Sequence, residues 1–414
     1  MIYVPFVYFL LLFLFIYKKH GFDASAYCAL LYMVTSFFSI WLSYIEPQYP
    51  SLRYVNFLPT VTYCLLLTLF ILPVYSFNSN TISKINFSSS KFVKYITVYY
   101  FVTFIAFIVA YRNDLIFRFF IGNMLEMKTS YQTGEGLALT RYPVYLEVFL
   151  APMRLTCELS YIMIFIFFYS LAFLKKSKFF NFMAIVGSLS GPLFGMLFID
   201  RSRTFWWIII AGLSLSIFWR HFNNRSKKLV RKIGIVFGSL IIAYMAVVSI
   251  QRFSDTNEGT KAFLIDYAGQ SFPIFCQVFE AFENPDGFTG RLIFPATHAF
   301  LLQDIQRDMS FQAEMTMRTG MEVGSFYTLL GTMLVGEGPM GIVVLLTLYY
   351  ILFYKAIGKM HRVISFEKLI VLFFLLIIPS CGCIAYFYTT YPTTLSAIAI
   401  IIVMYLMKSR TIQS

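Results

Sequence analysis

Arginines at the ends of apolar stretches are the residues of this sequence best suited to chemistry. Arg201 and Arg203 lie in a short turn between two such stretches, and Arg252 follows a third. Ionisable side chains at the edge of a membrane span are costly and usually functional. An arginine stays charged and presents a planar fork of donors that matches phosphate oxygens. These positions predict contact with an anionic lipid headgroup or a diphosphate, with ordinary interfacial anchoring as the alternative.

Arg154 and Glu158 form a second ionisable group at the end of an apolar stretch. They are four residues apart, so in a continuous helix they share one face and can pair. The sequence leaves open whether this pair is structural or belongs to a substrate site.

The elements that position these residues must lie largely in lipid. Of the 414 residues, 59% are hydrophobic and 13% are charged, and the mean hydropathy is +0.72. Soluble domains carry about a quarter charged residues. This composition excludes a cytosolic enzyme, a disordered chain and a disulfide scaffold. Five of the six cysteines, all but Cys276, lie in or beside apolar runs, where a thiol behaves as a small hydrophobe.

The apolar runs predict an all-α polytopic membrane protein whose residues 1–414 form a single integral membrane domain. A transmembrane helix needs roughly 17 to 25 residues. The first run lacks a basic n-region and a cleavage site, which favours a retained span over a removed signal peptide. The sequence predicts about eleven spans, within a range of ten to twelve, at 2–17, 25–45, 57–77, 95–111, 152–174, 181–199, 204–219, 233–250, 338–354, 369–387 and 393–407.

The distribution of charge predicts the orientation of these spans. Lys and Arg concentrate in the short connections on the cytoplasmic side of a membrane. With the C-terminus inside, those connections hold most of the basic residues, and Asp23 and Glu367 are their only acidic residues. The net charge of +13 is therefore a topology signal, and no nucleic-acid partner is predicted.

Two long connections, 112–151 and 251–337, then lie on the outer face. Connections longer than about 12 to 15 residues are usually functional, so we expect the chemistry here, above all in 251–337, which precedes the last three spans. Apolar residues at helical spacing predict amphipathic helices in this second connection, lying on the membrane surface or partly in it. The stripe consists of Phe272, Phe275, Phe279 and Phe282.

Motifs for several other chemistries are absent from the sequence. It has no GxxxxGK[ST] run, no HExxH, no CxxC pair and no DxD in the outer connections. ATP hydrolysis, a bound metal and a cofactor are therefore not predicted. Gly187, Gly191 and Gly195 are spaced by four residues, which predicts a close approach of another helix.

The end of the second outer connection carries two informative segments. Residues 325–331 read Ser-Phe-Tyr-Thr-Leu-Leu-Gly, and residues 336–341 read Gly-Glu-Gly-Pro-Met-Gly. They resemble the Asn-x-Tyr-Thr-x-x-Gly and Gly-x-x-Gly pattern of the Wzy-type O-antigen and capsule oligosaccharide repeat-unit polymerases, with Ser325 where that pattern often has Asn. Ser202-Arg203 and the segment 267–271 resemble two further motifs of these proteins.

The resemblance implies a metal-independent glycosyltransferase in the bacterial inner membrane, with its active site facing the periplasm and its C-terminus in the cytoplasm. Such an enzyme moves a growing glycan from undecaprenyl diphosphate onto the next lipid-linked repeat unit. Donor and acceptor are then both undecaprenyl-diphosphate-linked oligosaccharides. The segment 112–151 becomes the first periplasmic connection, and 251–337 becomes the periplasmic catalytic loop. The other implied partners are membrane lipid and a chain-length-determining co-polymerase.

This chemistry assigns roles to the ionisable residues. A diphosphate is a good leaving group that needs charge stabilisation, and fixed arginines supply it. The candidates are Arg201, Arg203, Arg252, Arg291, Arg318 and Arg154. Deprotonating the acceptor hydroxyl needs a positioned base, for which the candidates are His298, Glu322 and Glu337. Within the motif, Tyr327 and Thr328 are expected to contact substrate.

The sequence also leaves three other functions open. An O-antigen ligase is a related glycosyltransferase that differs in its acceptor. A lipid-linked oligosaccharide flippase would have shorter loops and an internal repeat, and the sequence shows no repeat. A membrane acyltransferase would need a histidine serving a cytoplasmic acyl donor, but the three predicted cytoplasmic histidines, His20, His221 and His361, each lie among basic residues.

Overall fold

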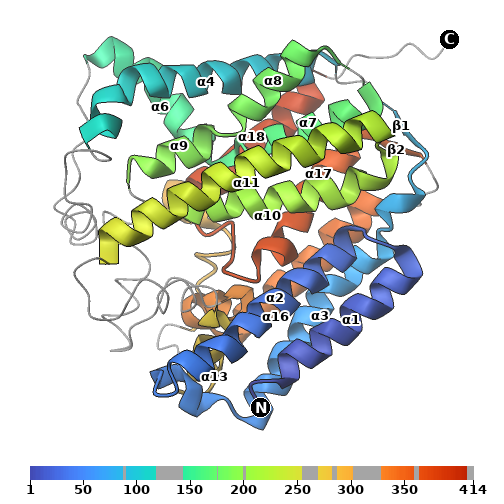
Figure 1. The fold of residues 1–414 in the computed structure, drawn as a ribbon, viewed down its shortest axis with the longest axis vertical. Helices are drawn as coiled ribbons and strands as arrows, with labels where there is room; N and C mark the ends of the chain where they lie inside the picture. The colour runs from blue at the N-terminus through green and yellow to red at the C-terminus, as the bar shows by residue number, and fades with distance from the viewer. Residues whose placement is uncertain are drawn as a thin grey trace. The chain divides into compact units, whose positions relative to one another are not determined.

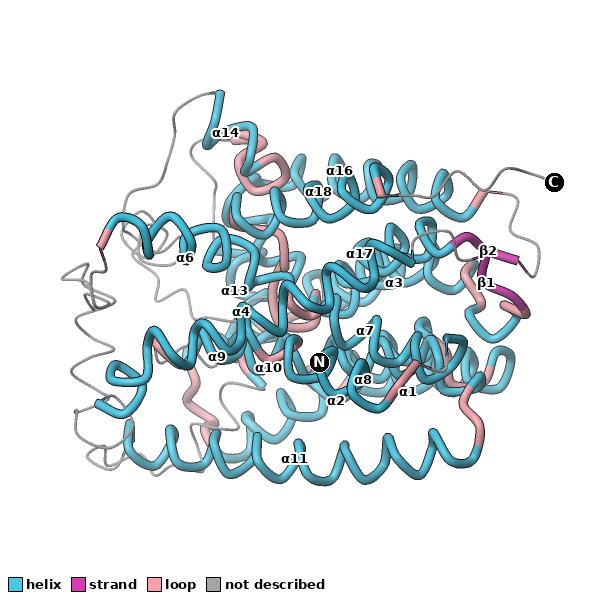
Figure 2. The backbone as a smooth tube through the Cα atoms, turned by 90° about the horizontal axis from the view of Figure 1, so that it is seen from above, coloured by secondary structure: helices cyan, strands magenta, loops and turns pink. Residues whose placement is uncertain are grey.

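A computed structural model of the chain describes residues 1–86, 90–117, 143–174, 176–198, 202–253, 269–281, 287–301, 328–358 and 363–407. Helices dominate these ranges (Figure 1). The described residues also form one two-stranded parallel sheet, in which β1 (Lys84–Asn86) pairs with β2 (Val363–Ser365) (Figure 2). The chain divides into two compact units.

The first unit comprises Met1–Ser83, Asn257–Arg362 and Lys368–Thr394. Its helix α2 follows Asp23, whose carboxylate accepts a hydrogen bond from the amide of Ala26 at 2.9 Å, as a helix N-cap does. The described helices of this unit are α1 (Val4–His20), α2 (Ala24–Ile45), α3 (Phe57–Ser76), α13 (Ser271–Ala281), α14 (Pro295–Leu301), α16 (Thr328–Ile357) and most of α17 (Phe366–Cys381), with 3₁₀ turns η1 (Pro50–Tyr54) and η2 (Ser79–Thr81).

Helix α13 packs its aromatic stripe against other helices of the first unit. Phe272 and Phe275 are buried, with ring centroids 4.9 and 5.2 Å from that of Tyr63 in α3. Gly269, just before the helix, lies against α2, where the Ser39 hydroxyl donates to the Gly269 carbonyl at 2.6 Å. The predicted helix is confirmed, and these two rings of its stripe pack on protein. Its placement on the membrane surface or partly in it stays a prediction, because apolar spacing does not distinguish a lipid partner from a protein partner.

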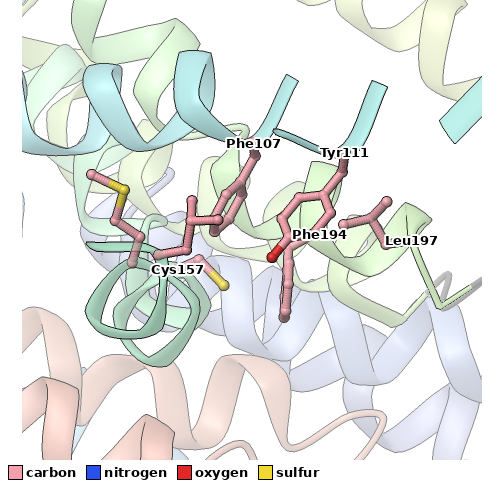
Figure 3. Packing of buried hydrophobic residues seen from close by; sticks show 7 residues of the cluster. Phe107, Tyr111, Cys157, Phe194 and Leu197 are labelled. Atoms are coloured by element: carbon pink, nitrogen blue, oxygen red, sulfur yellow. The ribbon is translucent and has the colours of Figure 1, made fainter. Parts of the chain in front are cut away.

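The second unit comprises Lys84–Thr256, Val363–Glu367 and Leu395–Ser414. Its described helices are α4 (Ser90–Ile116), α6 (Val144–Thr156), α7 (Ile162–Tyr169), α8 (Lys178–Gly187), α9 (Ser190–Met196), α10 (Ser202–Phe218), α11 (Asn224–Phe253) and most of α18 (Tyr391–Leu406), with short turns η4 (Cys157–Leu159), η5 (Ser170–Leu174) and η6 (Trp219–His221). Figure 3 shows one of its apolar clusters, formed by Phe107, Tyr111, Leu150, Met153, Cys157, Phe194 and Leu197.

Two helical segments of the second unit are interrupted, and the interruptions pack on each other. The segment of α6 and η4 bends by 64° into the segment of α7 and η5, and α8 gives way to α9 after Ser188. The Ser160 hydroxyl donates to the Ser188 carbonyl at 3.1 Å and accepts from the Gly191 amide at 2.9 Å. A Cβ on Gly191 would lie 2.8 Å from the carbonyl oxygen of Cys157, and a Cβ on Gly187 would lie 3.1 Å from the amide nitrogen of Phe101. The close approach predicted for these two glycines is confirmed.

Every predicted span overlaps a described helical segment. Among the described residues, six segments are long and apolar enough to cross a membrane, or seven if the bent pair of α6 and α7 forms one span. The six are Ala24–Ile45, Phe57–Thr81, Ser90–Ile116, Lys178–Met196, Ser202–His221 and Thr328–Ile357. The remaining predicted spans fall on α1, α11, α17 and α18. The all-α membrane fold is therefore confirmed, and the count of eleven spans stays a prediction.

Helix α16 begins at Thr328, ten residues before the start of the span predicted at 338–354. The apolar run from Leu329 to Val335 forms its first part, and Gly338 is non-helical and separates this part from the second. The extent of the second outer connection, 251–337, stays a prediction.

Candidate functional site

Glu337 is a carboxylate buried completely inside the first unit. It lies where α16 kinks, and none of its surface is exposed. Gly338 adopts φ +66°, a left-handed conformation that favours glycine, and Pro339 opens the second part of the helix, a position that suits proline. A Cβ on Gly341 would overlap the Cβ of Glu337. The Gly-Glu-Gly-Pro-Met-Gly segment therefore builds a kink and leaves room for one carboxylate.

A single turn holds the Glu337 carboxylate. Its Oε2 accepts from the Thr289 amide at 2.9 Å, from the Thr289 hydroxyl at 3.1 Å and from the Gly290 amide at 2.6 Å. Its Oε1 accepts from the Leu292 amide at 2.5 Å. Gly290 has φ +76°, which lets successive amides converge as in an anion-binding nest. Because a carboxylate offers about four lone-pair sites, these donors satisfy the buried charge.

His298 is attached to the same turn through its backbone and its ring. The Phe294 amide donates to the Gly290 carbonyl at 2.8 Å, and the His298 amide donates to the Phe294 carbonyl at 3.2 Å, which starts α14. The ring Nε2 lies 3.1 Å from the carbonyl oxygen of Thr289. A carbonyl oxygen only accepts, so Nε2 donates, and in the neutral ring the lone pair is on Nδ1.

One turn thus brings together three residues that the sequence singled out: Arg291, His298 and Glu337. Arg291 lies between the amides that bind Glu337, and its side chain is half-buried. The assembly combines a permanent cation, an imidazole with a defined basic nitrogen and a rigid backbone. Among the described residues, no group of three or more His, Cys, Asp and Glu side chains could hold a metal ion.

Sequence reasoning missed Thr289 and Gly290, the residues that connect Glu337 to His298. A signal was present, because Gly287 and Gly290 are three residues apart and such glycines mark tight turns. Both adopt positive φ, at +64° and +76°.

Arg203 of the second unit is paired with an acidic residue. Its Nη2 donates to Glu158 Oε1 at 2.9 Å, and its guanidinium carbon lies 5.1 Å from the centre of the Phe194 ring. The Tyr161 hydroxyl donates to the Arg203 carbonyl at 3.2 Å. Arg203 is therefore fixed at the start of α10, with 19% of its side chain exposed.

Arg154 is also paired, but not with the predicted partner. Its guanidinium forms an ion pair with Glu147 and donates to the Tyr111 hydroxyl at 3.2 Å. The predicted pair of Arg154 and Glu158 is wrong. It required a continuous helix, but α6 ends at Thr156 and the chain turns into η4, so Glu158 meets Arg203 instead.

Thr328 is buried at the start of α16. Its amide donates to the Ile384 carbonyl at 2.8 Å, and its hydroxyl accepts from the Gly331 amide at 3.4 Å. Its φ of +64° is a strained conformation for a β-branched residue. The Thr-x-x-Gly spacing thus allows a hydrogen bond within the first turn of the helix. Because the Thr328 side chain is buried, the structure does not support the substrate contact expected of it.

The remaining predicted site residues lie outside the described parts of the chain. These are Arg201, Arg318, Glu322 and Tyr327, together with the side chain of Arg252, whose backbone belongs to α11. No protein-family model, curated protein or solved structure significantly matches this chain.

Proposed function

We propose that the protein is a glycosyltransferase that polymerises undecaprenyl-diphosphate-linked oligosaccharide repeat units into an O-antigen or capsular polysaccharide. The observation that carries this proposal is the turn that presents Arg291 and His298 and is anchored by Glu337. It combines a cation that suits a diphosphate with a nitrogen base, and its anchor, Glu337, belongs to the segment 336–341 through which the sequence resembles the repeat-unit polymerases.

The proposed reaction needs one base and one fixed positive charge. The acceptor hydroxyl transfers its proton to Nδ1 of His298, and its oxygen bonds to C1 of the donor sugar. The bond from C1 to the diphosphate oxygen breaks, and its electron pair stays on the diphosphate. Arg291 stabilises the negative charge that develops there. Arg201, Arg252 and Arg318 are further proposed ligands of the diphosphates, with Tyr327 as a substrate contact.

Glu337 is not the base in this proposal. Its carboxylate is fully buried, and its lone pairs already accept four hydrogen bonds. Arg203 and Arg154 are engaged with Glu158 and Glu147, so either would bind a diphosphate only by sharing its guanidinium with that carboxylate. The other base candidate of the sequence is Glu322, which would be the base if His298→Gln kept its activity.

The reaction is proposed to occur at the periplasmic face of the bacterial inner membrane, as the resemblance to the repeat-unit polymerases implies. The charge distribution supports the orientation, with the C-terminus in the cytoplasm and the two long connections on the outer face. Both substrates reach that side as lipid-linked oligosaccharides. A chain-length-determining co-polymerase is the proposed protein partner.

The test uses the full-length protein in lipid vesicles with purified undecaprenyl-diphosphate-linked repeat units. The proposal predicts products longer than one repeat unit, visible as a ladder by gel or mass spectrometry. His298→Gln should lose the ladder, whereas His361→Gln, the matched control, should keep it. Transfer of glycan only onto a lipid A-core acceptor would identify a ligase, and movement of the intact lipid-linked unit across the bilayer would identify a flippase.

A further inference from the structure

We propose that Glu337 is a positioning residue that fixes the tautomer and orientation of His298. This inference rests on the proposed function, in which His298 is the base. It assigns the proton of the neutral ring to Nε2 and makes Nδ1 the nitrogen that receives the acceptor's proton.

Glu337 fixes the turn. It accepts hydrogen bonds from three amides of the turn, those of Thr289, Gly290 and Leu292, between 2.5 and 2.9 Å. Removing a buried acceptor leaves such amides without partners, which is strongly unfavourable. The kink and the missing side chain at Gly341 place the carboxylate in reach of these amides.

The turn held by Glu337 also fixes His298. The peptide group between Thr289 and Gly290 is held by Glu337 on its N–H side, through the Gly290 amide at 2.6 Å. Its carbonyl, that of Thr289, faces His298 Nε2 at 3.1 Å. Peptide groups are planar, so a hydrogen bond on one side of this group orients the acceptor on the other.

The same peptide group therefore links the carboxylate to the imidazole. Glu337 and His298 act through one shared element without touching each other. In hydrolases with a catalytic triad, a carboxylate that bonds directly to the histidine performs this orienting task; here a backbone carbonyl would do so, held in place by a buried carboxylate.

The direct test is the protonation pattern of the His298 ring. The chain has four histidines, so full-length protein labelled with ¹⁵N in its histidine rings and placed in lipid nanodiscs gives few signals. The His298 signal is assigned by its loss in His298→Gln. At a pH where the rings are neutral, the inference predicts the tautomer with hydrogen on Nε2. Hydrogen on Nδ1 in the wild-type protein would overturn it without any variant.

Two variants remove the anchor by different routes. Glu337→Gln places an NH₂ group among backbone donors, and Gly341→Ala displaces the Glu337 side chain without changing any charge. Both should turn the single His298 tautomer into a mixture. Glu280→Gln is the matched control, because Glu280 bonds to the Asn56 side chain, at 2.9 and 3.1 Å, and not to the turn. A single unchanged tautomer in both anchor variants would contradict the inference.

Kinetics separate a positioning role from a general loss of structure. In the polymerisation assay, Glu337→Gln should lower kcat roughly tenfold or more while KM changes little, because general bases contribute about 10²- to 10⁴-fold and only when correctly oriented. A raised KM at unchanged kcat would contradict a positioning role. If the wild-type protein shows the predicted tautomer but never polymerises, the proposed function fails and the control of His298 by Glu337 stands.

Discussion

The Cβ of Glu337 fills the space where Gly341, one helical turn later, would carry a side chain. The Gly-x-x-Gly spacing of this segment therefore has two physical causes. Gly338 supplies the kink through its positive φ. Gly341 leaves room for the Glu337 side chain, whose carboxylate binds the turn at 289–292.

Gly341→Ala should destabilise the first unit. The added methyl group meets the Glu337 side chain in a fully buried place, and overpacking of this kind costs about 1–3 kcal/mol. Thermal unfolding in detergent should show a lower Tm. Gly234→Ala is the control, because a Cβ there meets nothing within 4 Å, and its Tm should be unchanged or slightly raised. Equal Tm values for the two variants would contradict the packing described for Gly341.

Gly191→Ala should separate the two packed interruptions of the second unit. Its Cβ would lie 2.8 Å from the carbonyl oxygen of Cys157 and 2.9 Å from the Ser160 hydroxyl. We expect a loss of about 2 kcal/mol, measured by thermal unfolding. Gly238→Ala, in α11, has open space around its Cβ and serves as the comparison. A Gly191→Ala protein as stable as Gly238→Ala would show that the interruptions do not pack as described.

If Arg203 shares its guanidinium between Glu158 and a diphosphate, Arg203→Lys should lose most polymerisation activity while expression and insertion stay normal. Lysine keeps the charge but lacks the planar fork that binds phosphate oxygens. If Arg203 serves substrate as well as Glu158, then Glu158→Gln should retain more activity than Arg203→Lys. Full activity of Arg203→Lys in the vesicle assay would reduce Arg203 to an anchor for Glu158 and Phe194.

Asp23 makes stability depend on pH in a defined direction. Burial raises the pKa of the Asp23 carboxyl above its ordinary value of 3.8, although hydrogen bonds from Ala26 and Ser25 and the nearby His20 oppose this effect. The native state then binds the proton more tightly than the unfolded chain, so stability falls as the pH rises from 3.8 through the raised pKa.

Asp23→Asn isolates this effect. Asparagine keeps the cap on α2 but does not ionise. The Tm of the variant should therefore rise relative to that of the wild-type protein as the pH rises through this window, and the difference should then level off. Thermal unfolding at several pH values measures the difference. A Tm difference that stays constant, or one that shrinks as the pH rises, would contradict the burial of a charged Asp23.

The fold class was predictable from sequence because apolar runs report directly on helices in lipid. Boundaries were less predictable. The run ending at Val335 continues into a kink, and residues 152–174 contain a 64° bend that depends on packing between Ser160, Ser188 and Gly191. Spacing along a sequence describes one continuous helix, and it does not show where a neighbouring segment interrupts it.

The candidate site was predictable in its residue types but not in its connections. Arg291, His298 and Glu337 were chosen because they can carry charge or protons, yet the role of each depends on contacts that sequence does not reveal. Glu337 is buried among four donors, which favours anchoring over proton transfer. Thr289 carries no ionisable group and gave no chemical signal, although its carbonyl faces His298.

The most direct test of the polymerase proposal is a gel of surface polysaccharide from the source strain lacking this gene, with and without complementation. We expect a core bearing a single repeat unit in the deletion strain and a ladder restored by the wild-type gene but not by His298→Gln. A deletion strain whose core carries no repeat unit would rule out the polymerase proposal and point to ligation or flipping.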